Sequence, residues 1–307
     1  MTPRLARRAC GKLAFVGFLG LAGSCDSTQF PEPRRPASAP RIFDGLDFIP
    51  RDLDVVVRLD LEQIRLALGA HVLNQLRAQS TFGSTTPGAL DSALDTARTA
   101  WLGFRPAAST ELLDSVLVFS GRFARRELHT EAPKTWAPAE DLGGLLRRYQ
   151  RLGAVRRAEP ARAYLRGDDL LAFVSAVEID SVERVLAQGA DPDRLQPVAR
   201  GLVSFALRPR ALPMSLHQRA PKLAERLGRA RRIRGAVDAE GDWLEAVVEI
   251  DFSSEVEAAE AVALSRELLV VAKELYPKLA QFIASAELDA QGPVLVLKAR
   301  LRTVGIR

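Results

Sequence analysis

Few side chains in this sequence have the type and spacing of a catalytic or metal-binding group. The chain contains two cysteines, Cys10 and Cys25, and three histidines, His71, His129 and His217. No histidine has another three or four residues away, whereas a zinc site needs three or four ligands. The sequence contains neither a phosphate-binding glycine motif nor the Gly-x-Ser-x-Gly turn of serine hydrolases. We therefore expect a protein that is not an enzyme and holds no metal ion and no cofactor.

Cys25 has the clearest chemistry, because it follows a basic segment and then a short apolar run, residues 13–22. Ten apolar residues span about 15 Å as a helix, roughly half of a hydrocarbon core. The run therefore fits a signal peptide, residues 1–24, rather than a transmembrane helix. The residues before Cys25 resemble a bacterial lipobox, with Ala22 where leucine is commonest and Leu21 one place earlier. This resemblance implies lipidation of the Cys25 sulfur, with palmitate-type acyl chains that anchor the protein to a membrane.

The alternative for this cysteine is a plain secretory signal cleaved near Ala22, which would leave Cys25 as a free thiol. Cys10 lies in the removed segment, so Cys25 would then be a lone thiol in an oxidising compartment. Residues 26–41 contain four prolines and almost no apolar side chain, which predicts an extended tether. We expect residues 25–41 to be the lipidated cysteine and its tether, on the periplasmic or surface face of the cell envelope, with the choice of membrane left open.

The formal net charge of +5 comes mostly from the signal peptide. Residues 1–24 hold four of the 43 basic residues and no acid, which leaves 39 basic against 38 acidic residues. A chain this close to neutral argues against a nucleic-acid partner. Two arginine-rich segments remain, and they predict contact with an anionic lipid or polysaccharide through Arg147, Arg148, Arg151, Arg156, Arg157, Arg229, Arg231, Arg232 and Arg234. The other interpretation is a pair of solvent faces whose arginines are neutralised by nearby acids.

Hydrophobic periodicity predicts an α+β fold from residue 42 onward. The expected strands are 53–60, 115–121, 161–166, 170–177, 201–208, 231–238, 244–252 and 293–301. The expected helices are 61–76, 88–102, 180–188, 213–229 and a long one from 254 to the mid-280s. The order after residue 199 is β-α-β-β-α-β, the ferredoxin-like unit. The preferred architecture is a degenerate duplication of this unit in residues 42–198 and 199–307, with antiparallel sheets and helices packed on one face. One continuous antiparallel sheet is the alternative.

Apolar residues recur along one side of the long helix, at Val256, Ala259, Ala263, Val270 and Leu275. Such a stripe suits packing onto a sheet, which we expect here, and it also suits a groove for a partner.

Two short stretches, Phe48-Ile-Pro-Arg-Asp-Leu-Asp-Val-Val-Val-Arg-Leu-Asp60 and Arg166-Gly-Asp-Asp-Leu-Leu-Ala-Phe-Val-Ser175, carry a further resemblance. Together with the lipobox, they resemble a family of uncharacterised bacterial envelope lipoproteins, which often open with a hydrophobic-Pro-x-Asp stretch that runs into a strand. The resemblance implies a non-enzymatic envelope protein and carries no functional residue across.

Three functions follow from these features. The first is an anchored, exported lipoprotein that binds or scaffolds another envelope component, without catalysis. The second is a carrier of lipid or lipoprotein, which requires an apolar cavity between the sheet and the long helix. The third is an enzyme with an unrecognised site.

Overall fold

The structure is a computed structural model that describes residues 44–69, 71–74, 89–106, 114–123, 136–139, 146–153, 155, 159–212, 214–275 and 283–302. All of these residues belong to one compact unit, Ala39–Arg307. The signal peptide, Cys25 and the tether, residues 1–41, lie outside the described residues, so their assignments stay predictions.

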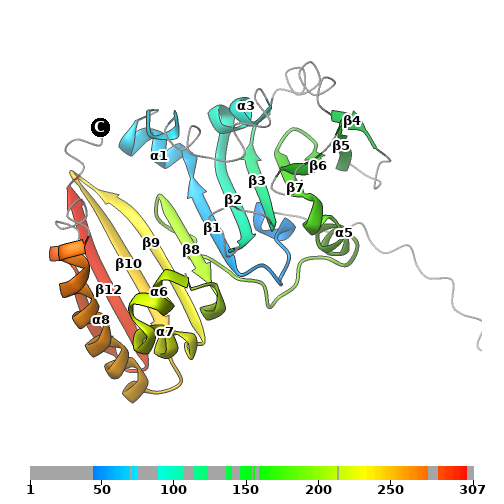
Figure 1. The fold of residues 1–307 in the computed structure, drawn as a ribbon. Coiled ribbons are helices and arrows are strands. Elements are labelled where there is room, and N and C mark those ends of the chain that lie inside the picture. Colours follow the sequence, from blue (N-terminus) through cyan, green and yellow to red (C-terminus); the bar gives the residue numbers. More distant parts are fainter. Residues whose placement is uncertain are drawn as a thin grey trace, which may run out of the picture. The chain divides into compact units, whose positions relative to one another are not determined.

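A single antiparallel sheet of 12 strands runs in the order β11-β12-β10-β9-β8-β1-β2-β3-β7-β6-β5-β4 (Figure 1). Its first seven strands are β1 Val55–Asp60, β2 Ala97–Arg105, β3 Asp114–Gly121, β4 Trp136–Pro138, β5 Leu146–Arg151, β6 Pro160–Arg166 and β7 Leu170–Ser175. The others are β8 Val203–Leu207, β9 Arg232–Glu240, β10 Trp243–Asp251, β11 Glu287–Gln291 and β12 Val294–Arg302. The α-helices are α1 Leu61–Leu68, α3 Ala89–Thr96, α5 Ile179–Gln188, α6 Met214–Arg219, α7 Pro221–Gly228 and α8 Glu255–Leu275. The short 3-10 helices are η1 Gly45–Phe48, η2 Ala176–Glu178 and η3 Pro209–Ala211.

The sheet is continuous across the boundary expected near residue 198, because β8 pairs with β1. A ferredoxin-like unit has its first and third strands side by side and parallel. Here β8 pairs with β1 and β9 instead, and both pairings are antiparallel. The ferredoxin-like duplication is therefore not confirmed, and the structure shows the continuous sheet. The halves share a simpler order, since a strand, a helical segment and a hairpin extend outward on each side of the β1–β8 pair.

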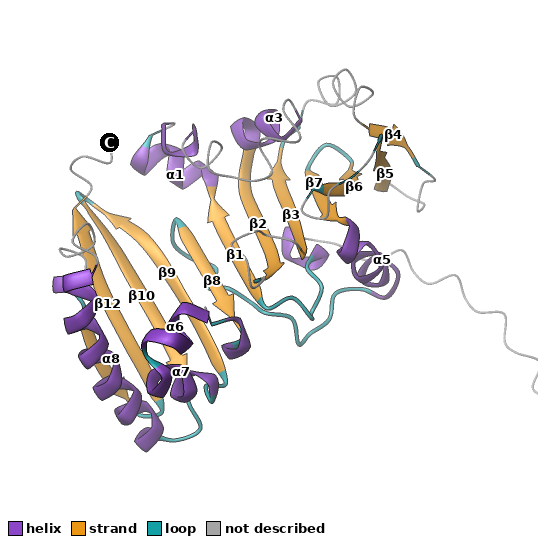
Figure 2. Cartoon of the chain, in the orientation of Figure 1, coloured by secondary structure: helices purple, strands orange, loops and turns teal. Residues whose placement is uncertain are grey.

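Helices cover both faces of the sheet, which corrects the expectation of helices on one face (Figure 2). Strands β1, β3 and β7 are apolar at successive positions, so both of their faces must be covered. On one face η1 and α5 pack through residues such as Phe48 and Val182. On the other face α1 and α3 pack at β1–β3 and β7, while α7 and α8 pack over β8–β12.

The helix predicted for residues 88–102 is wrong in its second half, because α3 ends at Thr96 and β2 begins at Ala97. Leu94, Ala97 and Trp101 have helical spacing, but Trp101 lies in a strand that is buried on both faces, where strand and helix patterns cannot be told apart. The helix predicted for 213–229 divides into α6 and α7, since Pro221 cannot donate a backbone hydrogen bond inside a helix. Strands β4, β5 and β11 were not predicted.

The long helix α8 turns its predicted stripe toward solvent rather than toward the sheet. Val256 and Val270 are each 67% exposed, and Ala259 and Ala263 are exposed as well. The helix packs on the sheet through other positions, among them Ala258, Ala261 and Val262. The expectation that this stripe packs onto the sheet is therefore wrong for these four residues. The fifth residue of the stripe, Leu275, has a side chain that the structure does not describe.

Candidate functional site

One face of the sheet carries an apolar row of five residues that are register partners on five strands. We call Leu59, Val203, Val237, Ala246 and Ala299 the apolar row; they lie on β1, β8, β9, β10 and β12. Leu59, Val203 and Val237 are partly exposed, while Ala246 and Ala299 are buried. Side chains alternate between the faces of a strand, so register partners share a face. The row therefore forms a continuous apolar strip across the middle of the sheet.

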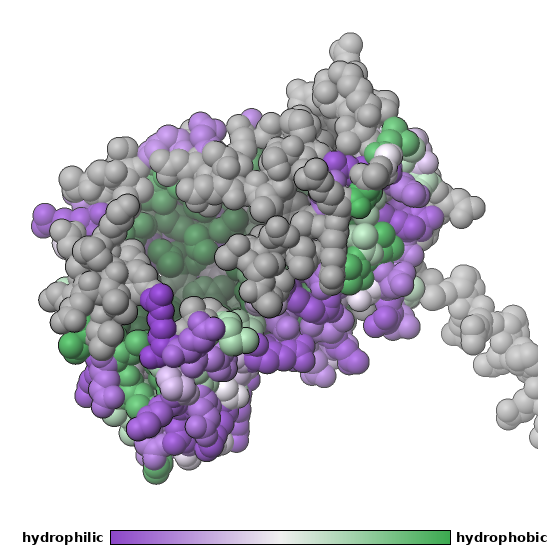
Figure 3. All heavy atoms as spheres, in the orientation of Figure 1, coloured by the Kyte–Doolittle hydropathy of each residue, from purple (hydrophilic) through white to green (hydrophobic). Residues whose placement is uncertain are grey.

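The residues beside the apolar row on the same face are also apolar. Ala239 and Leu244 lie on the side toward the β9–β10 turn, and Phe205 and Val248 lie on the side covered by α7 and α8. Along the described residues of β8, β9, β10 and β12, every side chain on this face is apolar, since the pleat places each charged one on the opposite face. Figure 3 shows a hollow on this face with a hydrophobic floor over the middle of the sheet. A hollow of this kind suits an apolar ligand.

The opposite face of β9, β10 and β12 is charged, and its charges form cross-strand ion pairs. Arg232 contacts Asp251 at 2.5 Å, and Arg234 contacts Glu249 at 2.6 Å. On the next strand pair Arg300 lies 3.2 Å from Glu245. Opposite charges on facing positions stabilise neighbouring strands. Arg232 and Arg234, two of the arginines predicted for anionic contact, are thus already beside carboxylates.

The other predicted arginines follow the same pattern where the structure describes their ion pairs. Arg229 contacts Glu225 at 2.6 Å, Arg148 contacts Glu183 at 3.0 Å and Arg151 contacts Glu159 at 3.2 Å. Among the rest, Arg147 lies on β5, Arg231 is exposed just before β9, and Arg156 and Arg157 lie outside the described residues. The two groups are not brought together, because six strands separate β5 from β9. These pairs support the interpretation of neutralised solvent faces, while the anionic contact stays a prediction.

Glu183 on α5 joins the helix to β5 and β6 through three donors. Its Oε1 accepts hydrogen bonds from Arg148, Arg162 and the Tyr164 hydroxyl, the last at 3.2 Å. The pKa of Tyr164 is raised to about 12, first by burial and then by the nearby Glu183 carboxylate, while Arg162 acts in the opposite direction. The cluster holds α5 on the sheet.

The hydroxyl of Tyr164 is expected to ionise at a higher pH than the hydroxyl of an exposed tyrosine. Its folded pKa, about 12, lies above the value of 10.0 for an exposed phenol, so its contribution to stability is complete below pH 10 and is lost as the pH rises toward 12. Absorbance at about 295 nm during an alkaline titration measures this ionisation. The late component should vanish in Tyr164→Phe, and a late component that persists in this variant contradicts the assignment.

The histidines and acids do not form a metal site within the described part of the chain. His71 follows α1 and His217 lies exposed on α6, whereas His129 lies outside the described residues. No three His, Cys, Asp or Glu side chains gather there as ligands of one ion. Among the same residues no helix has both the length and the hydropathy to cross a membrane.

By sequence, no protein family matches the chain, and no curated protein matches it. By structure, it is similar to two crystal forms of TP0453. Form I has a TM-score of 0.52 at 8% identity and covers 85% of this chain and 94% of that one. Form III has a TM-score of 0.51 at 9% identity, with coverages of 85% and 95%. The chain shares the fold of TP0453. At this identity the likeness shows the fold alone, a mixed α+β chain with a large antiparallel sheet.

Sequence reasoning missed the apolar row. Part of the pattern is visible in the strand predicted for 244–252. There Leu244, Ala246 and Val248 alternate with residues of the opposite face, two of which are glutamates. Single-strand alternation indicates that one face is apolar, but the row appears only when register aligns five strands that are distant in sequence.

Proposed function

We propose that the chain is an exported lipoprotein, anchored through Cys25, whose domain binds an apolar ligand such as a lipid acyl chain over the apolar row. The observation that carries the proposal is the hollow over a sheet face without charged side chains. This observation favours the carrier over the scaffold among the functions that the sequence suggests. The hollow is not the cavity between the sheet and the long helix that we expected for a carrier, because α8 packs directly on the sheet. The fold shared with TP0453 fits an envelope lipoprotein but does not specify the role.

The energetics suit an acyl chain. Burial of a methylene group is worth about 0.8 kcal/mol, so about ten buried methylenes give roughly 8 kcal/mol before the costs of association. The five residues of the apolar row lie on five neighbouring strands, which are spaced about 4.8 Å apart. A strip that crosses them is long enough for such a chain.

We also propose that the domain is not an enzyme and that its partners lie in the envelope rather than among nucleic acids. The ion-paired arginines and the near-neutral charge after the signal peptide argue against a nucleic-acid partner. The few histidines and cysteines and the lack of a phosphate-binding or serine-hydrolase motif argue against an enzyme.

The carrier proposal is tested by placing a charge in the apolar row. Val237→Asp puts a carboxylate in the middle of the apolar row. We therefore expect at least tenfold weaker binding of a fluorescent fatty acid, because an unpaired charge under a bound apolar ligand is costly. A fluorescence titration of the full chain in non-ionic detergent measures the affinity.

Val247→Asp is the matched control, because Val247 lies on the neighbouring strand with its side chain on the opposite face. We expect it to keep the affinity of the unmodified chain. The absence of fatty-acid binding in the unmodified chain, or equal loss in both variants, contradicts the carrier proposal and leaves the scaffold.

A further inference from the structure

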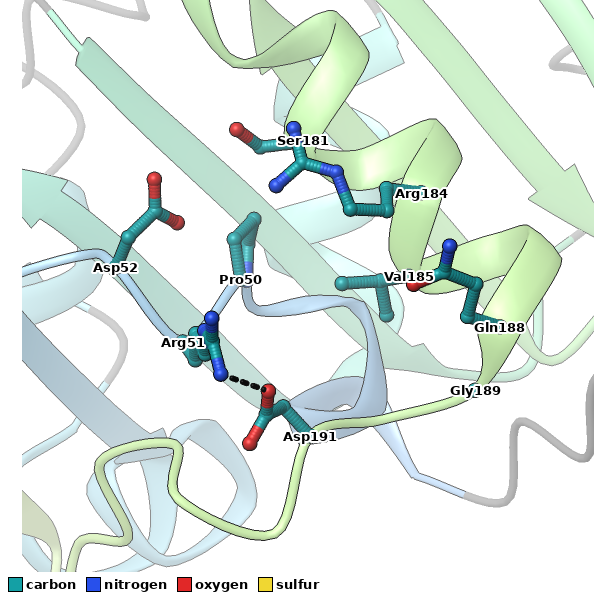
Figure 4. A pocket seen from close by; sticks show the side chains of 9 residues that line it. All are labelled: Pro50, Arg51, Asp52, Ser181, Arg184, Val185, Gln188, Gly189 and Asp191. Carbon is teal, nitrogen blue, oxygen red and sulfur yellow. Dashed lines mark hydrogen bonds and ion pairs between the residues drawn. The ribbon is translucent and has the colours of Figure 1, made fainter.

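A second cavity lies on the opposite face of the sheet, between α5 and the loop that joins η1 to β1. Its volume is about 160 Å³, and Figure 4 shows the side chains around it. Its charged lining consists of Arg51 and Asp52 from the loop, Arg184 from α5 and Asp191 after it. We infer that this pocket binds a small zwitterion with a phosphate group and an ammonium group.

One guanidinium in the pocket is free to bind an anion. Arg51 contacts Asp191 at 3.0 Å, and Asp52 contacts Arg105, outside the pocket, at 2.5 Å. The exposed Arg184 guanidinium has no hydrogen bond or ion pair with any described residue, and in Figure 4 it reaches from α5 toward the side where Asp52 lies. A phosphate group placed there gains the charge-assisted hydrogen bonds that a guanidinium fork offers.

The two carboxylates determine the rest of the ligand. Asp52 and Asp191 would repel a simple anion, so a phosphate beside Arg184 is best accompanied by a positive group that contacts them. An ammonium group supplies the donors that carboxylate oxygens accept. Pockets for drug-sized ligands have volumes of roughly 300 Å³ or more. This pocket is smaller, so its ligand is small as well.

The loop that carries Arg51 and Asp52 is fixed before any ligand arrives. Arg208 donates hydrogen bonds to the carbonyls of Arg51 and Leu53, and Arg210 donates one to the carbonyl of Asp52. Asp52 also accepts from Arg105, which contacts the buried Glu178. A preorganised loop loses little conformational freedom on binding, which favours a site over a passive surface depression.

The test uses O-phosphoethanolamine as the probe and the full chain in non-ionic detergent. Ligand-observed NMR should detect binding, and inorganic phosphate and ethanolamine should each bind at least tenfold more weakly. Arg184→Gln should weaken the probe at least tenfold. Arg122→Gln removes an exposed arginine outside the pocket and should leave binding unchanged. Thermal unfolding verifies that each variant folds.

No binding of the probe, equal binding of inorganic phosphate, or an unchanged affinity in Arg184→Gln overturns the inference. The same chemistry exists free in solution and as a phospholipid headgroup. The Cys25→Ala chain with vesicles of phosphatidylethanolamine or phosphatidylcholine distinguishes these sources. Arg184-dependent preference for the first vesicle assigns the headgroup, and binding of the soluble probe alone assigns the free compound.

Discussion

Replacement of Glu178 by alanine should lower the free energy of unfolding by about 3 kcal/mol. Glu178 is fully buried, and its carboxylate accepts a hydrogen bond from Arg105. Its removal leaves the half-buried guanidinium of Arg105 without one of its two acids and opens a cavity beneath η2. Urea denaturation measures the change, provided that the slope of the transition is preserved.

Asp52→Ala is the control for this prediction, because Asp52 contacts the same guanidinium but is 46% exposed. An exposed ion pair contributes about 1 kcal/mol or less, so this variant should lose far less stability. If the two variants lose the same amount, burial of Glu178 does not account for its effect.

The second large effect is expected for Gly235→Ala, at about 3 kcal/mol of lost stability. A β-carbon at Gly235 would lie 2.7 Å from the carbonyl oxygen of Val247 and 2.7 Å from Cζ of Phe205. The carbonyl belongs to the neighbouring strand and cannot move without separating β9 from β10. The phenylalanine ring would have to leave its position over the sheet. Thermal or urea unfolding measures the loss.

Gly228→Ala provides the comparison, since a β-carbon there meets no atom within 4 Å. Gly228 ends α7, where alanine restricts the unfolded chain more than glycine does. We expect this variant to gain about 0.5 kcal/mol, so the two Gly-to-Ala changes should have opposite signs. Equal losses at both positions contradict the close packing at Gly235.

Elements with a clear period could be predicted from the sequence. β1, β3, the β6–β7 hairpin, α5, β9, β10 and β12 all lie where alternation or helical spacing placed them. Asp60 caps α1, because its side chain accepts a hydrogen bond from the backbone N–H of Gln63, and aspartate directly before an apolar helical period is a local signal of this kind. These features depend on local residue order, which a single chain displays directly.

Features that depend on pairing between distant strands could not be predicted. The continuous sheet follows from the pairing of β1 with β8, strands whose local patterns do not indicate which neighbours they choose. β5 reads as a charged run, because Arg147, Arg148 and Arg151 outnumber its apolar residues. The direction of the α8 stripe also depends on the sheet, since Val256 and Val270 are spaced like core residues but face solvent.

The apolar row and the zwitterion pocket could not be predicted from the sequence either. Each gathers residues from segments far apart in the chain, such as Leu59 with Val237 or Arg51 with Arg184. Their side chains are ordinary in type, so only their juxtaposition indicates binding. The predicted lipid anchor is the opposite case, because the residues that indicate lipidation of Cys25 are contiguous in the sequence and can be recognised without the fold.

The anchor is tested most directly by metabolic labelling of the full chain with labelled palmitate in a bacterial host, followed by fractionation. The unmodified chain should carry label and sediment with membranes, because several acyl chains give stable anchoring. Cys10→Ala should behave identically, since Cys10 lies in the segment that we expect to be removed. Cys25→Ala should carry no label. Label retained by Cys25→Ala, or an unmodified chain that takes up none, contradicts the account.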